Sequence, residues 1–153
     1  MTEAGRWLSP REQDVWRSYL HAQQALREAL DQQIRRDAGM PHAYYQILVA
    51  LSECEGRRTS MTNLAGKVGS SPSRLSHAVN RLGARGWVSR HRDQDNRRIV
   101  LASLTEQGFA ALAAAAPGHV REVRRMIFDR LNPEQLDALA AVTAAMTAEP
   151  GPA

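Results

Sequence analysis

A chain of 153 residues with 43 % apolar residues can bury one hydrophobic core, and no segment approaches the roughly 18 uninterrupted apolar residues of a membrane-spanning helix. The net charge of +4 is unevenly distributed: residues 57–98 carry ten Lys and Arg against two acidic residues (net +8), and the rest carries ten basic and fourteen acidic residues (net −4). A basic block between acidic arms is typical of a module that binds a polyanion, although charge alone also fits an ordinary solvated surface.

A long N-terminal helix is predicted over residues 10–37. Ser9 suits the N-cap position, with Pro10 at the first helical position and Glu12 completing a capping box. Apolar residues then recur at spacings of three and four, and Gly39 ends the pattern. So long an amphipathic helix in so small a chain needs a further surface to lie against.

Three shorter helices and one extended segment follow the long helix. The helices are predicted at 42–54, at 62–68 and from Pro72 to a stop at Gly86, and the segment at 57–61 is predicted to be extended. Ser71 suits the N-cap of the last of these helices. The short Gly-Ser-Ser turn before it joins two helices in the manner of a helix-turn-helix.

A hairpin and two helices complete the chain. Strands are predicted at 87–92 and 98–104 around a polar tip, followed by a helix over 105–131 that Pro117 should kink or divide. A last helix begins at Pro133. Its apolar side is formed by Leu136, Leu139, Val142 and Met146.

This order of elements predicts a winged helix-turn-helix, whose second helix enters the major groove of DNA. The helix over 72–85 suits that role because its polar side carries many hydrogen-bonding side chains and no acid. Arginines fit guanine or phosphate and Asn80 fits adenine, whereas Ser71 at the helix N-terminus and Arg90 would hold phosphates. The candidate groove residues are Ser73, Arg74, Ser76, His77, Asn80 and Arg81.

The sequence resembles the MarR family of bacterial transcriptional regulators over nearly its whole length. The matching motifs are Ser-Pro-Ser-x-x-Ser at the start of the recognition helix, Arg-Leu-x-x-x-Gly-Trp-Val after it and Leu-Thr-x-x-Gly after the wing. The resemblance implies a mainly α fold with a small β-hairpin, in which residues 39–104 form a DNA-binding lobe. Residues 1–38 and 105–153 would form helices that interlock in a homodimer, which explains the long amphipathic arms.

The wing departs from the family pattern by one residue. In the family, Asp-x-Arg precedes Leu-Thr at a fixed distance, whereas Asp95 and Arg97 lie one residue too far away, and Asn96 and Arg98 occupy the expected places. Either the wing carries a one-residue bulge or Asn96 replaces the acid. We expect Arg97 or Arg98 to reach the minor groove, and we prefer Arg97 because Asp95 can orient it.

The resemblance also implies a small aromatic or anionic effector, bound between the dimer helices and the DNA-binding lobe. Aromatic and charged residues near that junction are the candidates to contact it, although aromatic residues at helical spacing more often belong to a core. The candidates are Trp16, Arg17, Tyr19, His42, Tyr44, Tyr45 and Arg124.

No other class of site is predicted. The five histidines are scattered without metal-ligand spacing, and there is no phosphate loop, nucleophile elbow or acid pair, so we expect no metal, no cofactor and no enzyme activity. Cys54 stands between Glu53 and Glu55, whose charges disfavour a reactive thiolate. The single cysteine and an N-terminal segment without an apolar export core predict a cytoplasmic protein.

Together these features predict a homodimeric regulator, acting as a repressor, that binds double-stranded DNA at a pseudo-palindromic operator and is released by an effector. The competing interpretation is a winged-helix module for protein interaction or ligand binding that lacks specific DNA readout. The positive charge concentrated in residues 57–98 favours DNA binding, since such a module has no use for it.

Overall fold

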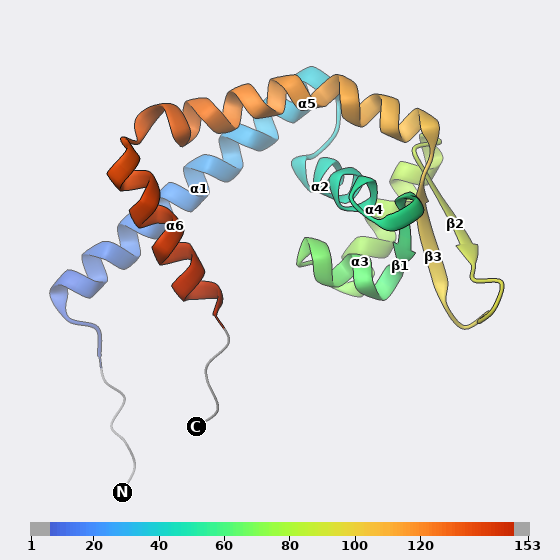
Figure 1. Cartoon of the computed structure of the whole chain (residues 1–153), viewed down its shortest axis with the longest axis horizontal. Coiled ribbons are helices and arrows are strands. Elements are labelled where there is room, and N and C mark those ends of the chain that lie inside the picture. The colour runs from blue at the N-terminus through green and yellow to red at the C-terminus, as the bar shows by residue number, and fades with distance from the viewer. Residues whose placement is uncertain (1–6, 149–153) are drawn as a thin grey trace, which may run out of the picture.

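The computed structural model describes residues 7–148, and two long helices extend over a smaller lobe (Figure 1). α1 (Pro10–Ala38) and α5 (Glu106–Met126) pack against each other, and the lobe lies beneath one end of this pair. α6 (Pro133–Thr147) turns back from the far end of α5 and approaches the N-terminal part of α1. The fold is mainly helical with a small antiparallel sheet, as predicted.

α1 begins and ends close to the residues that its sequence predicts. Ser9 Oγ accepts a hydrogen bond from the backbone N–H of Glu12, and Glu12 Oε2 accepts one from the backbone N–H of Ser9 at 2.7 Å, which completes the capping box. Gly39 closes the helix in the left-handed conformation, with φ 62°. All buried residues of α1 lie within Leu30–Ile34, so most of the helix extends beyond the lobe.

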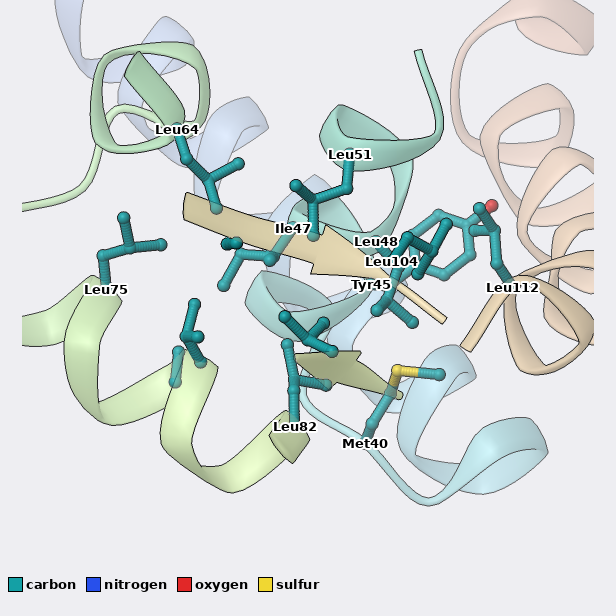
Figure 2. Close-up of a cluster of buried hydrophobic side chains, with 14 of the residues drawn as sticks. Met40, Tyr45, Ile47, Leu48, Leu51, Leu64, Leu75, Leu82, Leu104 and Leu112 are labelled. Carbon is teal, nitrogen blue, oxygen red and sulfur yellow. The ribbon is translucent and has the colours of Figure 1, made fainter. Parts of the chain in front are cut away.

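The lobe is built on α2 (His42–Ser52), α3 (Met61–Val68) and α4 (Pro72–Ala84), which pack with the sheet around one hydrophobic core. Figure 2 shows apolar side chains of all three helices converging with Leu104 of the sheet and Leu112 of α5. Fully burying a side chain of this kind contributes about 1.5–3 kcal/mol. The core therefore fixes the orientation of α4. The residues from α2, α3 and α4 that solvent does not reach are Leu48, Leu51, Leu64, Val79 and Leu82.

The sheet has three antiparallel strands in the order β1-β3-β2. They are β1 (Arg58–Ser60), β2 (Val88–Arg92) and β3 (Val100–Leu104). β2 and β3 form the predicted hairpin, with Val88 paired to Leu104. The segment predicted to be extended supplies β1, which pairs with the other side of β3.

The chain turns earlier after α2 than the sequence predicts. α2 ends at Ser52, not at Cys54, and a short 3-10 turn, η1 (Glu55–Arg57), leads into β1. Gly56 and Arg57 both have positive φ angles, 61° and 53°, which a continuing right-handed helix does not allow.

Pro117 was predicted to kink or divide this helix, and α5 is not divided there, because Pro117 lies inside one helix from Glu106 to Met126. Proline removes the N–H that would bond to the carbonyl of Ala113, one turn earlier. Both residues are exposed, so that carbonyl can bond to water and the helix continues.

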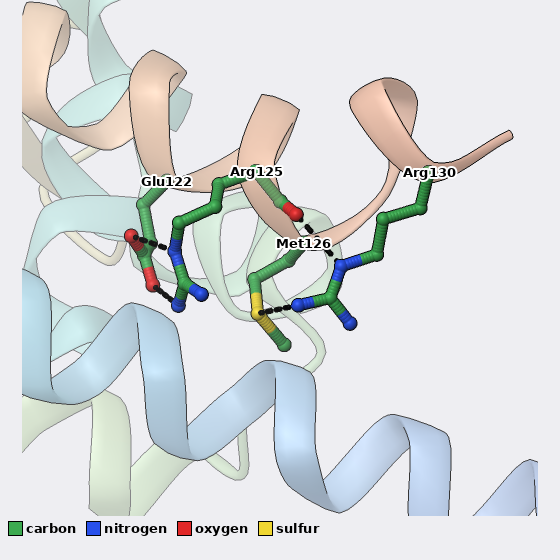
Figure 3. Close-up of polar contacts among 4 residues, drawn as sticks. All are labelled: Glu122, Arg125, Met126 and Arg130. Atoms are coloured by element: carbon green, nitrogen blue, oxygen red, sulfur yellow. Dashed lines mark hydrogen bonds and ion pairs between the residues drawn. The ribbon is translucent and has the colours of Figure 1, made fainter.

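The end of α5 also differs from the prediction. The helix stops at Met126, short of residue 131, and a second 3-10 turn, η2 (Phe128–Arg130), follows. In Figure 3, Arg130 Nε donates to the backbone carbonyl of Arg125 at 2.9 Å. A helix C-terminus leaves such carbonyls without a donor, so the returning arginine stabilises the early stop.

Large apolar side chains are exposed on the outer part of α1 and on α6, and we call them the arm surface. Trp16 is 50 % exposed and Met146 57 %, so in a single chain this surface meets water. Within residues 7–148 no helix has the length and apolar character to cross a membrane. The arm surface consists of Val15, Trp16, Tyr19 and Leu20 on α1, and of Leu136, Leu139, Val142 and Met146 on α6.

Candidate nucleic-acid interface

Local capping and one glycine turn place α4 at the surface of the lobe. Ser60 Oγ accepts the N–H of Asn63 at the start of α3, and Gly69 ends that helix in the left-handed conformation, with φ 61°. Two residues later Ser71 Oγ accepts the N–H of Arg74 at 3.4 Å and starts α4. The two helices and this short turn form the predicted helix-turn-helix.

α4 has one buried side and one polar side. Leu75, Ala78, Val79 and Leu82 are buried in the lobe core. The helix contains no acidic residue, so its outward side combines donors, acceptors and positive charge. The structure thus brings all the candidate groove residues together: Ser73, Arg74, His77, Asn80 and Arg81 are exposed and Ser76 is half-buried.

Arg90 links the wing to α4. From β2, its Nη1 donates to Asn80 Oδ1 at 2.8 Å and lies 3.4 Å from Ser76 Oγ. From the sequence, Arg90 was predicted only to contact a phosphate, and nothing in the sequence indicated its hydrogen bond to the candidate groove residue Asn80. The side chain is exposed, so it remains accessible to DNA while it holds this position.

The wing tip is organised by Asp93, which sequence analysis did not single out. Asp93 Oδ1 accepts the backbone N–H groups of Asp95 and Asn96, both at 2.9 Å, a turn that a leading aspartate favours. In the described part of the chain, Asp95 forms no hydrogen bond or ion pair with Arg97, so the reason for preferring Arg97 over Arg98 is not supported. Both arginines are exposed at the tip, and the choice between them stays open.

Comparison with known proteins agrees with this geometry. A model of the MarR family matches residues 41–100. The structure matches that of Sco3205, a MarR family transcriptional regulator from Streptomyces coelicolor crystallised in complex with DNA, with 46 % sequence identity and a TM-score of 0.90. The match covers 98 % of this chain and 95 % of Sco3205. The chain belongs to the MarR family.

Two further relatives support the assignment. AbsC, a MarR family regulator from Streptomyces coelicolor, is 37 % identical, with a TM-score of 0.87 over 93 % of this chain and 95 % of AbsC. The transcriptional repressor MprA of Escherichia coli K12 is 24 % identical over 124 residues, which are 81 % of this chain and 69 % of MprA. The predicted family and winged-helix fold are confirmed, and the family consists of transcriptional regulators, not enzymes.

The candidate effector residues of this MarR family regulator do not lie in one pocket. Trp16 and Tyr19 line a hollow of about 410 Å³ between α1 and α6, and Tyr44 lines one of about 500 Å³ beside α4. His42 and Tyr45 line a third hollow, of about 420 Å³, where the arms meet the lobe. The two charged candidates contact residues close to them in the sequence. Arg17 bonds to Gln13 and pairs with Asp14, and Arg124 forms an ion pair with Asp129.

The third hollow contains a histidine pair that the sequence did not reveal. The rings of His42 on α2 and His119 on α5 stack with centroids 5.2 Å apart, and the ring of Tyr45 lies 4.5 Å from that of His119. Burial lowers the pKa of His42, and the charge of His119 lowers it further, against an opposing effect of Asp31. Burial also lowers the pKa of His119. Both lowered pKa values favour the neutral imidazoles at neutral pH.

This pair predicts a loss of stability in mild acid. Below a pH of about 6.5 the histidines of the unfolded chain take up protons that the folded chain resists, so the free energy of unfolding should fall between pH 7 and pH 5. His119→Phe should make this fall shallower, because one suppressed titration is removed. Urea denaturation at several pH values between 7 and 5 measures the free energy of unfolding of wild type and of His119→Phe. His91→Gln, which removes an exposed histidine of the wing, is the control. If the free energy of unfolding fell equally steeply with pH in all three proteins, the expectation would be contradicted.

Proposed function

We propose that this MarR family regulator is a homodimer that binds a pseudo-palindromic operator, represses transcription and is released by a small-molecule effector. The observation that carries the proposal is the acid-free outward side of α4, flanked by Arg90 and the wing arginines. The related Sco3205 was crystallised with DNA, and the related MprA is a repressor. This function requires the chain to act in the cytoplasm, where its operator lies.

The proposed readout divides the basic surface into three parts. α4 lies in the major groove, which at ~12 Å wide admits a single helix. Ser71 at the N-terminus of α4 and Arg90 on β2 hold phosphates, and Arg97 or Arg98 enters the minor groove. The base edges are read mainly by Arg74, His77, Asn80 and Arg81, with support from Ser73 and Ser76.

The arm surface supports the homodimer. We assign residues 39–104 to the DNA-binding lobe, and the arm helices α1, α5 and α6 to the dimer. Contiguous exposed apolar side chains of this kind mark a protein contact, and a second copy of the chain is the partner that a two-fold symmetric operator requires. The two recognition helices of such a dimer would meet successive major grooves, about 10 bp apart.

The dimer is tested by placing a charge on the arm surface. Val142→Glu should shift the protein from dimer to monomer, because the carboxylate would be buried without a partner. Ala144→Glu is the matched control, since it adds the same charge on the other side of α6, away from Val142 and Met146. Sedimentation velocity measures the change; a Val142→Glu protein that remains dimeric would place the dimer contact elsewhere.

Selection of bound duplexes from a random pool tests the operator. We expect enriched sequences with two inverted half-sites centred about 10 bp apart. Enrichment of a single half-site would contradict the dimeric readout, and no enrichment would favour the alternative module without specific readout. That alternative is disfavoured by the net charge of +8 in residues 57–98, which a module without DNA does not need.

The effector site is best assigned to the hollow beside the histidine pair. Its lining includes Leu30 of α1, Gln46 of α2 and Lys67 of α3, so an occupant would touch an arm and the lobe at once. An occupant there can change the distance between the two lobes of a dimer. Lys67 and the neutral imidazoles offer hydrogen bonds to an anionic or aromatic compound.

A further inference from the structure

The contact between Arg90 and Asn80 has a consequence for base reading. We propose that Arg90 is a positioning residue that fixes the carboxamide of Asn80 and so sets the base that Asn80 accepts; this inference rests on the proposed DNA-binding function. Arg90 Nη1 lies 2.8 Å from Asn80 Oδ1. A guanidinium has only donors, so the amide must turn its oxygen, not its nitrogen, toward Arg90.

This orientation determines what Asn80 offers to the groove. One lone pair of Oδ1 is occupied by Arg90, which leaves the second lone pair and the amino group. Among the hydrogen bonds of the described residues, none involves the Asn80 amino group, and the residue is exposed. The amino group and the second lone pair of Oδ1 together match adenine, whose N7 accepts a hydrogen bond and whose N6 donates one. Cytosine presents only a donor in the major groove, and is disfavoured.

The alternative is that the proposed phosphate contact is the only role of Arg90, and the structure supplies a matched control that separates the two possibilities. Arg92 lies two residues further along β2, on the same side of the strand, and is also exposed. Its Nη1 donates to the carbonyl of Arg97 in the wing tip at 2.8 Å, so it is anchored away from α4. Arg92 therefore carries the charge of Arg90 without its contact to Asn80.

The test compares operator duplexes that carry each of the four bases at the position where Asn80→Ala loses discrimination. Wild type should prefer adenine there, and should lose the preference when 7-deazaadenine replaces it. Arg90→Ala should lose the same preference, by about 5- to 150-fold in relative affinity, the usual range for a bidentate contact. The double variant should discriminate no worse than either single variant, whereas Arg92→Ala should bind all duplexes more weakly with the preference intact.

The contradicting results are distinct. If Arg90→Ala weakens every duplex equally and keeps the adenine preference, Arg90 is only a phosphate contact and the inference is wrong. If Asn80→Ala changes no base preference, Asn80 reads no base and the inference is also wrong. If wild type binds no duplex preferentially, the proposed function itself fails. Arg90→Met, which keeps the aliphatic stem, replaces Arg90→Ala if the latter lowers the thermal midpoint.

Discussion

Gly108→Ala is expected to destabilise the fold by about 3 kcal/mol, a large effect for the addition of one methyl group. A Cβ at this position would lie 2.1 Å from the carbonyl oxygen of Trp87 and 2.8 Å from Leu104 Cδ1. That oxygen also accepts the N–H of Thr105 at 3.0 Å, so the backbone before β2 cannot move away without losing the contact that ties α5 to the wing.

Thermal denaturation measures this effect. Gly66 supplies a control in which the same substitution should have the opposite effect on stability. A loss of about 3 kcal/mol should lower the midpoint by about 10 °C in a chain of this size. Gly66 lies within α3 with nothing within 4 Å of the position of an added Cβ. Gly66→Ala should therefore raise stability by roughly 0.5–1 kcal/mol, the usual gain in a helix interior. Equal midpoints for Gly108→Ala and wild type would show that α5 can withdraw from Trp87.

Arg74→Ala and Arg81→Ala are each expected to weaken operator binding by about 1–3 kcal/mol. Both arginines are exposed on the outward side of α4, two helical turns apart, so their effects should add in the double variant. An arginine that reads guanine should relax specificity at one position. An arginine that holds a phosphate should weaken all duplexes equally and lower the salt dependence by one contact.

Competition binding with single-base variants of the operator separates these roles. Arg27→Ala is the control, because Arg27 is an exposed arginine of α1, outside the lobe. Removing it subtracts the same charge from the chain and should change operator affinity little. If both α4 variants bound the operator as wild type does, α4 could not be the helix that enters the groove.

Features set by neighbouring residues were predictable from the sequence. The capping box of Ser9 and Glu12 and the Ser71 cap depend on residues within one turn of each other, and the hairpin joins two strands that follow each other directly in the chain. Periodicity likewise identified the buried side of α4, and hence its outward polar side. The candidate groove residues could be predicted because the helical repeat determines which side chains lie on the same side of α4.

Contacts between distant segments were not predictable in the same way. His42 and His119 looked like scattered histidines, because only the packing of α2 against α5 brings their rings together. The bond from Arg90 to Asn80 depends on how the wing lies against α4. Gly108 belongs to the Leu-Thr-x-x-Gly motif, but the close approach of Trp87, which explains why a glycine is needed there, appears only in the folded chain.

Some local predictions also failed, because the outcome depended on solvent exposure or on contacts that the sequence does not show. Pro117 was expected to kink or divide α5, and the helix is not divided, because its exposed position lets water satisfy the freed carbonyl. The end of the same helix was placed too late, because the apolar pattern continues past the point where Arg130 caps the last turn. Asp93 was overlooked in favour of Asp95, since only the folded turn distinguishes the two acids.

The most direct test of the account is fluorescence anisotropy with a duplex from upstream of the protein's own gene, against a scrambled duplex, over a salt series. We predict preferential binding to the upstream duplex, with log affinity falling linearly against log salt at a slope of about −0.9 per phosphate contact. The basic wing and α4 should supply several such contacts. No binding to either duplex, even at low salt, would contradict a regulator that reads DNA.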